Sequence, residues 1–212
     1  ELSPAQMGNL SDALDTKVMD RTLIILDIFA KRAFTREGKI QVELAQLKYR
    51  ASKLTGQGKA LSRLGGGIGT RGPGEKKLEM IRTRISRLKA ELRDVVKHRE
   101  VQRKQRQKNH LPVVCIVGYT NAGKSTLLNH FTNAGVYEED QLFATLDPTT
   151  KSLDLSGGQT ILMTDTVGFI RKLPHHLVEA FKSTLEEAKY SDLILHVVDA
   201  SNPQKEKQME AV

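Results

Sequence analysis

A glycine-rich segment followed by lysine and serine lies near the middle of the chain, and its residue types suit phosphate chemistry. Residues 118–126 read GYTNAGKST and contain the spacing G-x-x-x-x-G-K-S. Glycines at 118 and 123 allow backbone N–H groups to turn toward phosphate oxygens, and a helix N-terminus adds partial positive charge. Lys124 would then reach the β- and γ-phosphates, and the Ser125 hydroxyl would bind Mg²⁺. The motif therefore predicts a nucleoside triphosphate site.

Two further segments hold residues that would complete this site. The letters DTVG, residues 165–168, follow an apolar run, so Asp165 is expected at the tip of a neighbouring strand, where it would hold Mg²⁺ through water. The Gly168 N–H would then contact the γ-phosphate. Between the motifs lies DQLFATLDPTT, residues 140–150, which has the length of a switch segment, and its Thr145 would add a Mg²⁺ ligand. The alternative is that this threonine is only a turn residue before the next proline.

Short apolar runs that alternate with helical patterns must position these motifs. The run LPVVCIV, residues 111–117, is predicted to form a buried strand immediately before the glycine-rich loop. Further strands are predicted over 151–156, 159–165 and 192–200, the last one buried, and helices over 124–134 and 174–190. Strands that alternate with helices indicate a parallel or mixed α/β sheet, which binds its ligand at the carboxyl ends of the strands.

The region before the predicted sheet shows a heptad pattern instead. Apolar residues recur every three or four positions in two stretches, first at Ile40, Leu44, Leu47, Ala51 and Leu54, then at Leu78, Ile81, Ile85, Leu88, Leu92 and Val95. Two such seams separated by a glycine-rich segment predict an antiparallel helical hairpin. The second seam fades after Val95, so its last turns are expected to lose their partner and to lead into a linker near residues 109–110.

The predicted hairpin tip, residues 65–74, contains six glycines and even a G-x-G-x-x-G pattern at 67, 69 and 72. A dinucleotide-binding loop of that pattern follows a buried strand. The letters before this one, QGKALSRL, are polar and helical in pattern. The tip is therefore predicted not to bind nucleotide.

Positive charge is concentrated beside this tip. The chain has a formal net charge of +8, and residues 82–108 alone hold eleven Lys or Arg against three acids. A local basic surplus favours a polyanionic partner, and a thin glycine-rich tip suits a narrow space walled by RNA. We therefore expect RNA contacts at Gly66, Gly67, Arg71, Gly72, Lys76, Lys77, Arg82 and Arg84. The alternative is a solvated helical surface with a flexible connector.

The first 35 residues are expected to be the end of a domain whose beginning is absent. Ser3, followed by proline, and Asp20 are predicted to cap the starts of two helices. No run of about 18 uncharged apolar residues occurs, so no segment is expected to span a membrane. The predicted divisions of the chain are this N-terminal remnant, a basic helical hairpin and a nucleotide-binding domain, over residues 1–38, 39–110 and 111–212.

Taken together, these motifs resemble those of one family. The segments GYTNAGKST, QLFATLDPTT and ILMTDTVGFIRKLPH, with GGGIGTRGPGE upstream, are similar to the HflX family of translation-associated GTPases across nearly the whole chain. The resemblance implies a P-loop GTPase domain that follows a helical hairpin and the remnant of an N-terminal α/β domain. It also implies GTP hydrolysis with Mg²⁺ in the cytoplasm, and the protein is expected to be a monomer. Such a protein would bind the large ribosomal subunit through its RNA and would separate stalled or idle ribosomes.

The resemblance also implies roles for individual residues. Lys124, Thr145 and Gly168 would act on the reacting phosphate, and Ser125, Thr145 and Asp165 would hold Mg²⁺, the last of them through water. Nucleotide contacts would fall on Gly118, Tyr119, Thr120, Asn121, Ala122, Gly123, Lys124, Ser125, Phe143, Ala144, Thr145, Leu146, Asp147, Asp165, Thr166, Val167 and Gly168. Asn121 would coordinate a stimulatory K⁺ or, equally, would only be a turn residue.

The sequence departs from the family pattern in two places. No N-K-x-D segment, which reads guanine, occurs before the last residue, Val212. A chain without that loop is expected to bind nucleotide poorly and to be inactive by itself. Phe169 follows DTVG where Ras-like enzymes have a glutamine that orients the attacking water, so slow hydrolysis with help from a partner is expected.

Two other classes of function compete with this interpretation. The first is an RNA-binding module in which nucleotide only orders the structure. The second is a phosphotransferase that uses the same phosphate-binding loop, and the DTVG segment and the threonine-bearing switch segment argue against it.

Overall fold

The computed structural model describes residues 2–56, 73–108, 111–132, 143, 145–173, 177–178 and 181–212. Two helices open the chain, α1 (Pro4–Leu14) and α2 (Arg21–Arg32). Both predicted caps are confirmed, because the Ser3 and Asp20 side chains accept hydrogen bonds from backbone N–H groups in the first turn of each helix. The part of residues 1–35 that the structure describes contains no strand.

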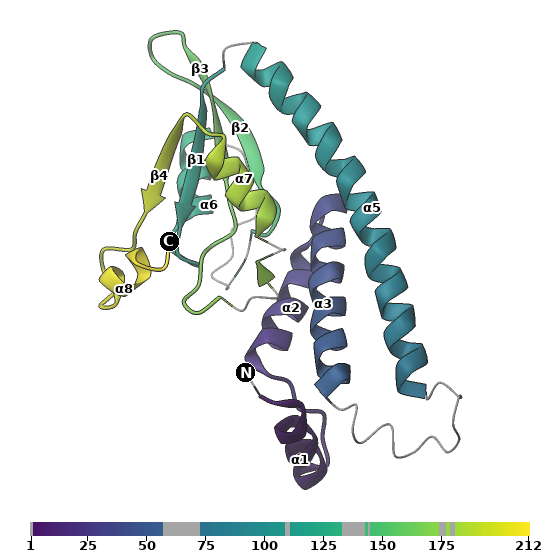
Figure 1. The fold of residues 1–212 in the computed structure, drawn as a ribbon. Helices are drawn as coiled ribbons and strands as arrows, with labels where there is room; N and C mark the ends of the chain where they lie inside the picture. The colour runs from purple at the N-terminus through teal and green to yellow at the C-terminus, as the bar shows by residue number, and fades with distance from the viewer. Residues whose placement is uncertain are drawn as a thin grey trace.

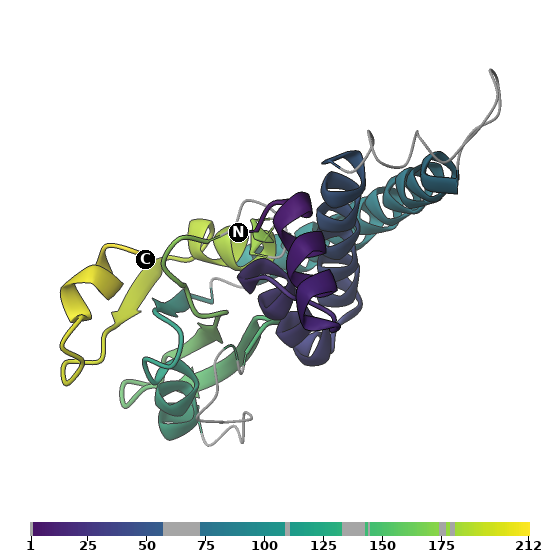
Figure 2. The same cartoon turned by 90° about the horizontal axis from the view of Figure 1, so that it is seen from below.

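Two long helices, α3 (Arg36–Gly56) and α5 (Pro73–Lys108), run antiparallel and form the predicted hairpin (Figure 1). Three side chains of the two seams are buried between them, Ile40 and Leu44 from α3 and Leu88 from α5, and other seam residues pack around these at Leu47, Ile85, Leu92 and Val95. The glycine-rich tip lies outside the described residues. Seen from below, the hairpin extends away from the sheet (Figure 2).

The hairpin seam does not simply fade after Val95, as the sequence suggests. Arg99, the next residue in register, places its guanidinium 2.8 Å from Glu37 on α3 and also pairs with Glu186 beyond the hairpin. The turn of α5 that carries Arg99 therefore keeps partners, but these partners are ionic, which an apolar repeat cannot reveal.

A four-stranded mixed sheet follows, as predicted. Its strands are β1 (Val113–Gly118), β2 (Thr149–Asp154), β3 (Thr160–Asp165) and β4 (Leu193–Val197), in the order β2-β3-β1-β4. Strand β1 pairs parallel with β3 and β4, whereas β2 pairs antiparallel with β3. Helices α6 (Lys124–Thr132) and α7 (Lys182–Lys189) lie on opposite faces of the sheet, and α8 (Lys205–Met209) follows β4 (Figure 1).

Two predicted elements differ from the observed ones. Strand β4 stands at one end of the described sheet, and its Leu193 and Ile194 are 54% and 51% exposed in this chain, where the apolar run predicted a buried strand. The helix predicted over 174–190 begins only at Lys182 in the described residues. Among the described helices, none is both long and apolar enough to cross a membrane.

Two apolar clusters stabilise the sheet region. One lies between the sheet and α6 and is centred on Val114, Ile116, Leu128 and Met163. The other joins the helical region to the rest of the chain, because it contains Ile25, Leu26 and Phe29 of α2, Val42, Ala45 and Tyr49 of α3, and also Phe143, Leu146, Val167, Ile170, Leu177 and Phe181. The segments that carry the predicted switch and DTVG motifs are therefore packed directly against α2 and α3.

Candidate nucleotide-binding site

The glycine-rich loop connects β1 to α6, as the motif requires. Gly118 lies at a close approach of two strands, because a Cβ atom there would lie 2.4 Å from the carbonyl oxygen of Val197. Gly123 has a φ of +88°, a left-handed conformation that side chains rarely adopt. Asn121 also has a positive φ, of 59°, which asparagine tolerates and which supports the turn interpretation of this residue.

Lys124 is buried at the start of α6, with 6% of its surface exposed. Its ammonium donates a hydrogen bond to the carbonyl oxygen of Tyr119, at 2.8 Å, within the same loop. Burial lowers the pKa of this lysine to about 8, and the nearby Asp165 carboxylate opposes that shift. The ammonium is thus held under the loop, at the place where the motif predicts contact with phosphate.

The three predicted Mg²⁺ ligands meet at the carboxyl end of the sheet. The Ser125 hydroxyl donates to the Asp165 carboxylate at 2.6 Å, and the Thr145 hydroxyl donates to the same oxygen at 3.0 Å. The two hydroxyl oxygens are 2.9 Å apart. The residues come from the start of α6, the switch segment and the end of β3, so only the tertiary fold brings them together.

The chemistry of this oxygen set fits magnesium, a hard cation that prefers carboxylate, hydroxyl and water oxygens. Asp165 is fully buried, and burial raises the pKa of its carboxyl group, against the hydrogen bonds from Ser125 and Thr145 and the charge of Lys124. A magnesium ion held by the two hydroxyl oxygens would bring positive charge close to the Asp165 carboxylate. Elsewhere in the described residues, no group of three or more His, Cys, Asp or Glu side chains is arranged to hold a metal ion.

The DTVG segment lies against the glycine-rich loop through its backbone. The Thr120 N–H donates to the Phe169 carbonyl oxygen at 2.8 Å, and the Phe169 N–H donates to the Gly118 carbonyl oxygen at 3.0 Å. The Phe169 ring lies 6.0 Å from the ring of Phe181, between ring centroids. It therefore packs toward the core, and it has no group that would orient a water molecule.

The side chains of Thr166 and Val167 serve the fold instead of the loop. The Thr166 hydroxyl donates to the Ile116 carbonyl oxygen of β1 at 2.7 Å, and Val167 is fully buried in the cluster shared with α2 and α3. The predicted nucleotide contacts at these two residues would therefore be made by their backbone atoms.

Gly168 is required by this close backbone packing, and its substitution is expected to be costly. A Cβ atom at this position would lie 2.5 Å from the Cα atom of Thr120. We expect Gly168→Ala to lower the free energy of unfolding by about 1–3 kcal/mol, because backbone atoms must move apart. The matched control is Gly157→Ala, where a Cβ atom would have no neighbour within 4 Å. Urea unfolding measures both variants, and equal stabilities would contradict the close packing at Gly168.

The side chains of the switch segment pack against the helical region, whereas the sequence prediction placed this segment at the nucleotide. Phe143 and Leu146 are each 3% exposed within the cluster shared with α2 and α3, and the Phe143 ring lies 4.8 Å from that of Phe29. The Asp147 carboxylate accepts hydrogen bonds at the start of α3, so it does not face the glycine-rich loop. Ala144 lies outside the described residues.

A second contact between the helical region and this site was not predicted. The Arg21 guanidinium, at the start of α2, donates to the carbonyl oxygens of Arg171 and Lys172 at 2.9 and 3.0 Å. These residues follow the DTVG segment. The sequence carried no signal for this contact, because its partners are separated by 150 residues and it uses backbone acceptors, which any residue possesses.

The predicted RNA contacts are only partly described by the structure. Lys76, Lys77 and Arg82 are exposed on α5, whereas Gly66, Gly67, Arg71 and Gly72 lie outside the described residues. The Arg84 guanidinium makes two hydrogen bonds to Glu43 of α3, at 2.7 and 3.0 Å. Arg84 is thus paired within the hairpin, and its contact with RNA stays a prediction.

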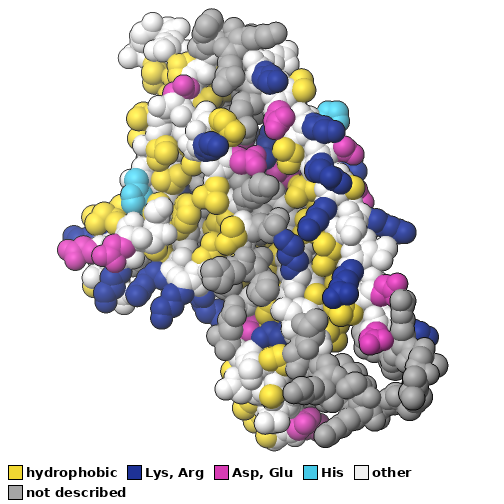
Figure 3. Space-filling view, viewed as in Figure 1, with side chains coloured by type: hydrophobic (Ala, Val, Ile, Leu, Met, Phe, Trp, Pro, Cys, Tyr) yellow, Lys and Arg dark blue, Asp and Glu magenta, His cyan; other side chains and the backbone are white. Residues whose placement is uncertain are grey.

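A row of exposed basic residues runs along α5 beyond those that the sequence prediction named. Lys and Arg side chains follow the helix on the face drawn in Figure 3. The row consists of Arg82, Lys89, Arg93, Lys97 and Lys104, whose spacing of seven, four, four and seven places them on one side of the helix. None of the five makes an ion pair within the described part of the chain. We call these five residues the basic row.

Models of known protein families match nearly the whole chain. Three family models match it in succession, described as GTP-binding GTPase N-terminal (residues 1–30), GTP-binding GTPase Middle Region (32–106) and 50S ribosome-binding GTPase (113–212). A solved GTP-binding protein from the hyperthermophilic archaeon Sulfolobus solfataricus, in complex with GDP, is 29% identical with a TM-score of 0.50. The match covers all of this chain and 54% of that one.

Two bacterial proteins named GTPase HflX are much closer in sequence. The protein of Lacrimispora saccharolytica is 74% identical and that of Escherichia coli (strain K12) 53% identical, each over 216 residues that include all of this chain. The chain spans about half the length of these curated relatives, 51% and 50% respectively. With its P-loop GTPase fold, its helical hairpin and these matches over its full length, the chain belongs to the HflX family.

Proposed function

We propose that the protein binds GTP with Mg²⁺ and hydrolyses it to GDP and phosphate. The observation that carries this proposal is the meeting of Ser125, Thr145 and Asp165 beside the buried Lys124. A serine, a switch threonine and a strand-end aspartate are the groups that hold magnesium in P-loop GTPases. The recognition of guanine is part of the proposal and rests on the family, because the chain contains no N-K-x-D segment.

Each residue then has a definite role. Lys124 would neutralise charge on the β- and γ-phosphates, the two hydroxyls would hold Mg²⁺, and Asp165 would hold it through water. Gly168 would offer its N–H to the γ-phosphate. The bound ion would neutralise charge that develops on the phosphates. A K⁺ site at Asn121 is a further proposal, and the turn conformation of that residue does not require it.

We further propose that the partner is RNA of the large ribosomal subunit and that the protein acts in the cytoplasm on stalled or idle ribosomes. The basic row supports this proposal, because five cations without an ion-pair partner among the described residues form a surface for phosphates on one side of a helix. The hairpin that carries them projects away from the sheet (Figure 2). RNA that is bound there would leave the nucleotide site accessible.

The decisive experiment measures GTP turnover with and without purified large ribosomal subunits. It uses the extended chain, by which we mean these residues within a protein of the relatives' full length. Because Phe169 cannot orient water, turnover alone should be slow, and subunits should raise it at least about tenfold, in the direction of the increases of about 10³–10⁵ that partner-supplied groups give other GTPases. Fast turnover without subunits, or no stimulation by them, would contradict the proposal.

Charge reversal in the basic row tests the RNA surface separately. We expect the triple variant Arg82→Glu, Lys89→Glu and Arg93→Glu to bind large subunits more weakly. A plot of log affinity against log salt should become shallower by about two to three, because three cations no longer neutralise phosphates. The matched control reverses three exposed lysines outside the hairpin, Lys17, Lys31 and Lys205, and thus changes the net charge equally. If both triple variants bind equally weakly, the attraction is diffuse and the basic row is not the RNA surface.

A further inference from the structure

Gly38 stands in the first turn of α3, where a glycine has no evident use as a helix former. The need for a glycine at this position comes from a contact with a distant segment of the chain. A Cβ atom on Gly38 would lie 2.1 Å from the Oδ1 atom of Asp147 and 3.0 Å from its Cγ atom. The glycine therefore leaves the space in which the carboxylate of the switch segment lies against the helix.

The Asp147 carboxylate binds the two residues just before the start of this helix. Its Oδ2 atom accepts hydrogen bonds from the N–H groups of Phe34 and Thr35, both at 2.8 Å. Its Oδ1 atom accepts from the Thr35 hydroxyl at 2.5 Å, and that hydroxyl in turn accepts from the Gly38 N–H at 3.0 Å. A negative charge at a helix N-terminus is favourable, because it satisfies free N–H groups and complements the helix dipole. Three charge-assisted bonds thus join residues 112 and 113 positions apart.

The other end of the described switch segment is also anchored to the helical region. Phe143 has a φ of 59°, a conformation that is strained for a bulky side chain, and burial against Phe29 holds it there. Its N–H donates to the Thr120 hydroxyl at 3.1 Å. Thr145, a predicted Mg²⁺ ligand, therefore lies between two anchors, the Phe143 ring against α2 and the hydrogen-bonded Asp147 carboxylate at the start of α3.

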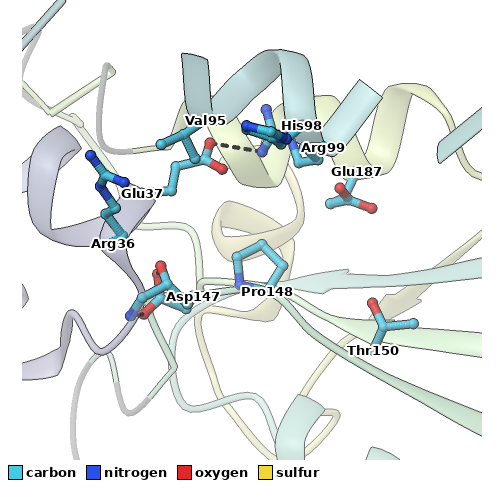
Figure 4. A pocket seen from close by; sticks show the side chains of 10 residues that line it. Arg36, Glu37, Val95, His98, Arg99, Asp147, Pro148, Thr150 and Glu187 are labelled. Carbon is cyan, nitrogen blue, oxygen red and sulfur yellow. Dashed lines mark hydrogen bonds and ion pairs between the residues drawn. The ribbon is translucent and has the colours of Figure 1, made fainter. Parts of the chain in front are cut away.

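The Asp147 carboxylate has open space beside it. A cavity of about 370 Å³ lies beside Asp147, between the start of α3, the α5 turn that carries His98 and Arg99, and the segment that leads into β2 (Figure 4). Arg36, Glu37, Pro148, Thr150 and Glu187 also line it, so acidic and basic side chains both face the cavity. A carboxylate that left the helix start would find open space there, so release would not require the core to be rebuilt.

We propose that Asp147 is a positioning residue that couples the position of Thr145 to the start of the hairpin helix α3. Asp147 follows Thr145 by two positions, so a shift of the threonine toward or away from a bound ion moves the carboxylate on the helix. This inference rests on the proposed function, since the ion and the triphosphate would provide the shift. Consequently, the nucleotide state changes how well the first turn of α3 is ordered. This change reaches the hairpin that carries the basic row, because α3 is one of its two helices.

The test uses variants from both sides of the contact. Gly38→Ala introduces the better helix former but displaces the Asp147 carboxylate, whereas Asp147→Ala removes the carboxylate itself. The matched control is Gly8→Ala in α1, where a Cβ atom would have no neighbour within 4 Å. Native-state hydrogen exchange is measured at the Phe34 and Thr35 amides. Both test variants should exchange about ten- to a hundredfold faster there, the double variant no faster than either, and the control unchanged.

The coupling is then measured in the extended chain, as the ratio of affinities for large subunits with a non-hydrolysable GTP analogue and with GDP. The wild type and Gly8→Ala should show the same ratio, and Gly38→Ala and Asp147→Ala should bring it close to one. A ratio that both variants retain would overturn the coupling role, and unchanged amide exchange would overturn the contact itself. A wild-type ratio of one would overturn the nucleotide-driven coupling, while the exchange result would still decide the contact.

Discussion

Replacing Arg99 by methionine is expected to lower the free energy of unfolding by about 3–5 kcal/mol, the destabilisation observed when one partner of a buried ion pair is removed. The Arg99 side chain is 14% exposed, and it pairs with Glu37 and Glu186, which are 14% and 23% exposed. It therefore joins α3, α5 and α7 at the junction of the hairpin and the nucleotide domain. Without it, these carboxylates would remain close together and poorly hydrated.

A second arginine on the same helix provides the matched control for this prediction. Arg84 also pairs with a glutamate of α3, Glu43, but the two side chains are 47% and 40% exposed. Pairs that exposed contribute roughly 0–1 kcal/mol, so Arg84→Met should cost little. Urea unfolding of both variants gives the comparison. Equal destabilisation would show that Arg99 contributes no more than a surface ion pair.

The destabilisation in the Arg99 variant should depend on pH in a definite direction. Burial raises the pKa of the Glu37 carboxyl, and Arg99 partly opposes that shift. Without Arg99 this pKa should rise further, so the folded state would bind a proton more tightly than the unfolded state. Stability should then fall as pH rises through the folded pKa. The effect of Arg99→Met should consequently be larger at about pH 8 than at about pH 5, and the opposite trend would refute this account.

Lys124→Ala is expected to lower the affinity of the extended chain for GTP by about ten- to a hundredfold for each phosphate that the ammonium binds, and to abolish measurable hydrolysis. In the absence of nucleotide, stability should change little, because the buried ammonium loses hydration and has a lowered pKa. Titration with a fluorescent GTP analogue measures the affinity. The exposed Lys205→Ala is the control and should behave like the wild type.

The same variant separates the two leading functions. Lys124 is buried within the glycine-rich loop and is not part of the basic row, so binding of Lys124→Ala to large subunits should persist in the absence of nucleotide. If the variant binds RNA but no longer responds to GTP, the protein is a nucleotide-driven switch. If its action on ribosomes is unimpaired, the nucleotide only orders the structure, and the RNA-binding module is the correct interpretation.

The sequence by itself determined the parts of this protein whose interactions are local. The glycine-rich loop with Lys124 and Ser125, the caps at Ser3 and Asp20, and the two heptad seams each depend on neighbours within a few residues or on one regular period. The strands that surround the loop were predicted for the same reason. Asp165 was also expected beside Ser125, because strand ends of an α/β sheet meet at one edge, and Thr145 was expected there as part of the switch segment; the fold brings both to Ser125.

The tertiary structure alone decided where the charged and aromatic side chains of the switch region go. Asp147 was expected near nucleotide, and its carboxylate binds the residues just before α3; Arg84 was expected on RNA and pairs with Glu43; Arg99 continues a seam as an ion pair. The physical reason is common to all three. Their partners lie dozens of residues or more away, and spacing along a chain carries no information about which distant carboxylate, helix start or strand will be adjacent in the fold.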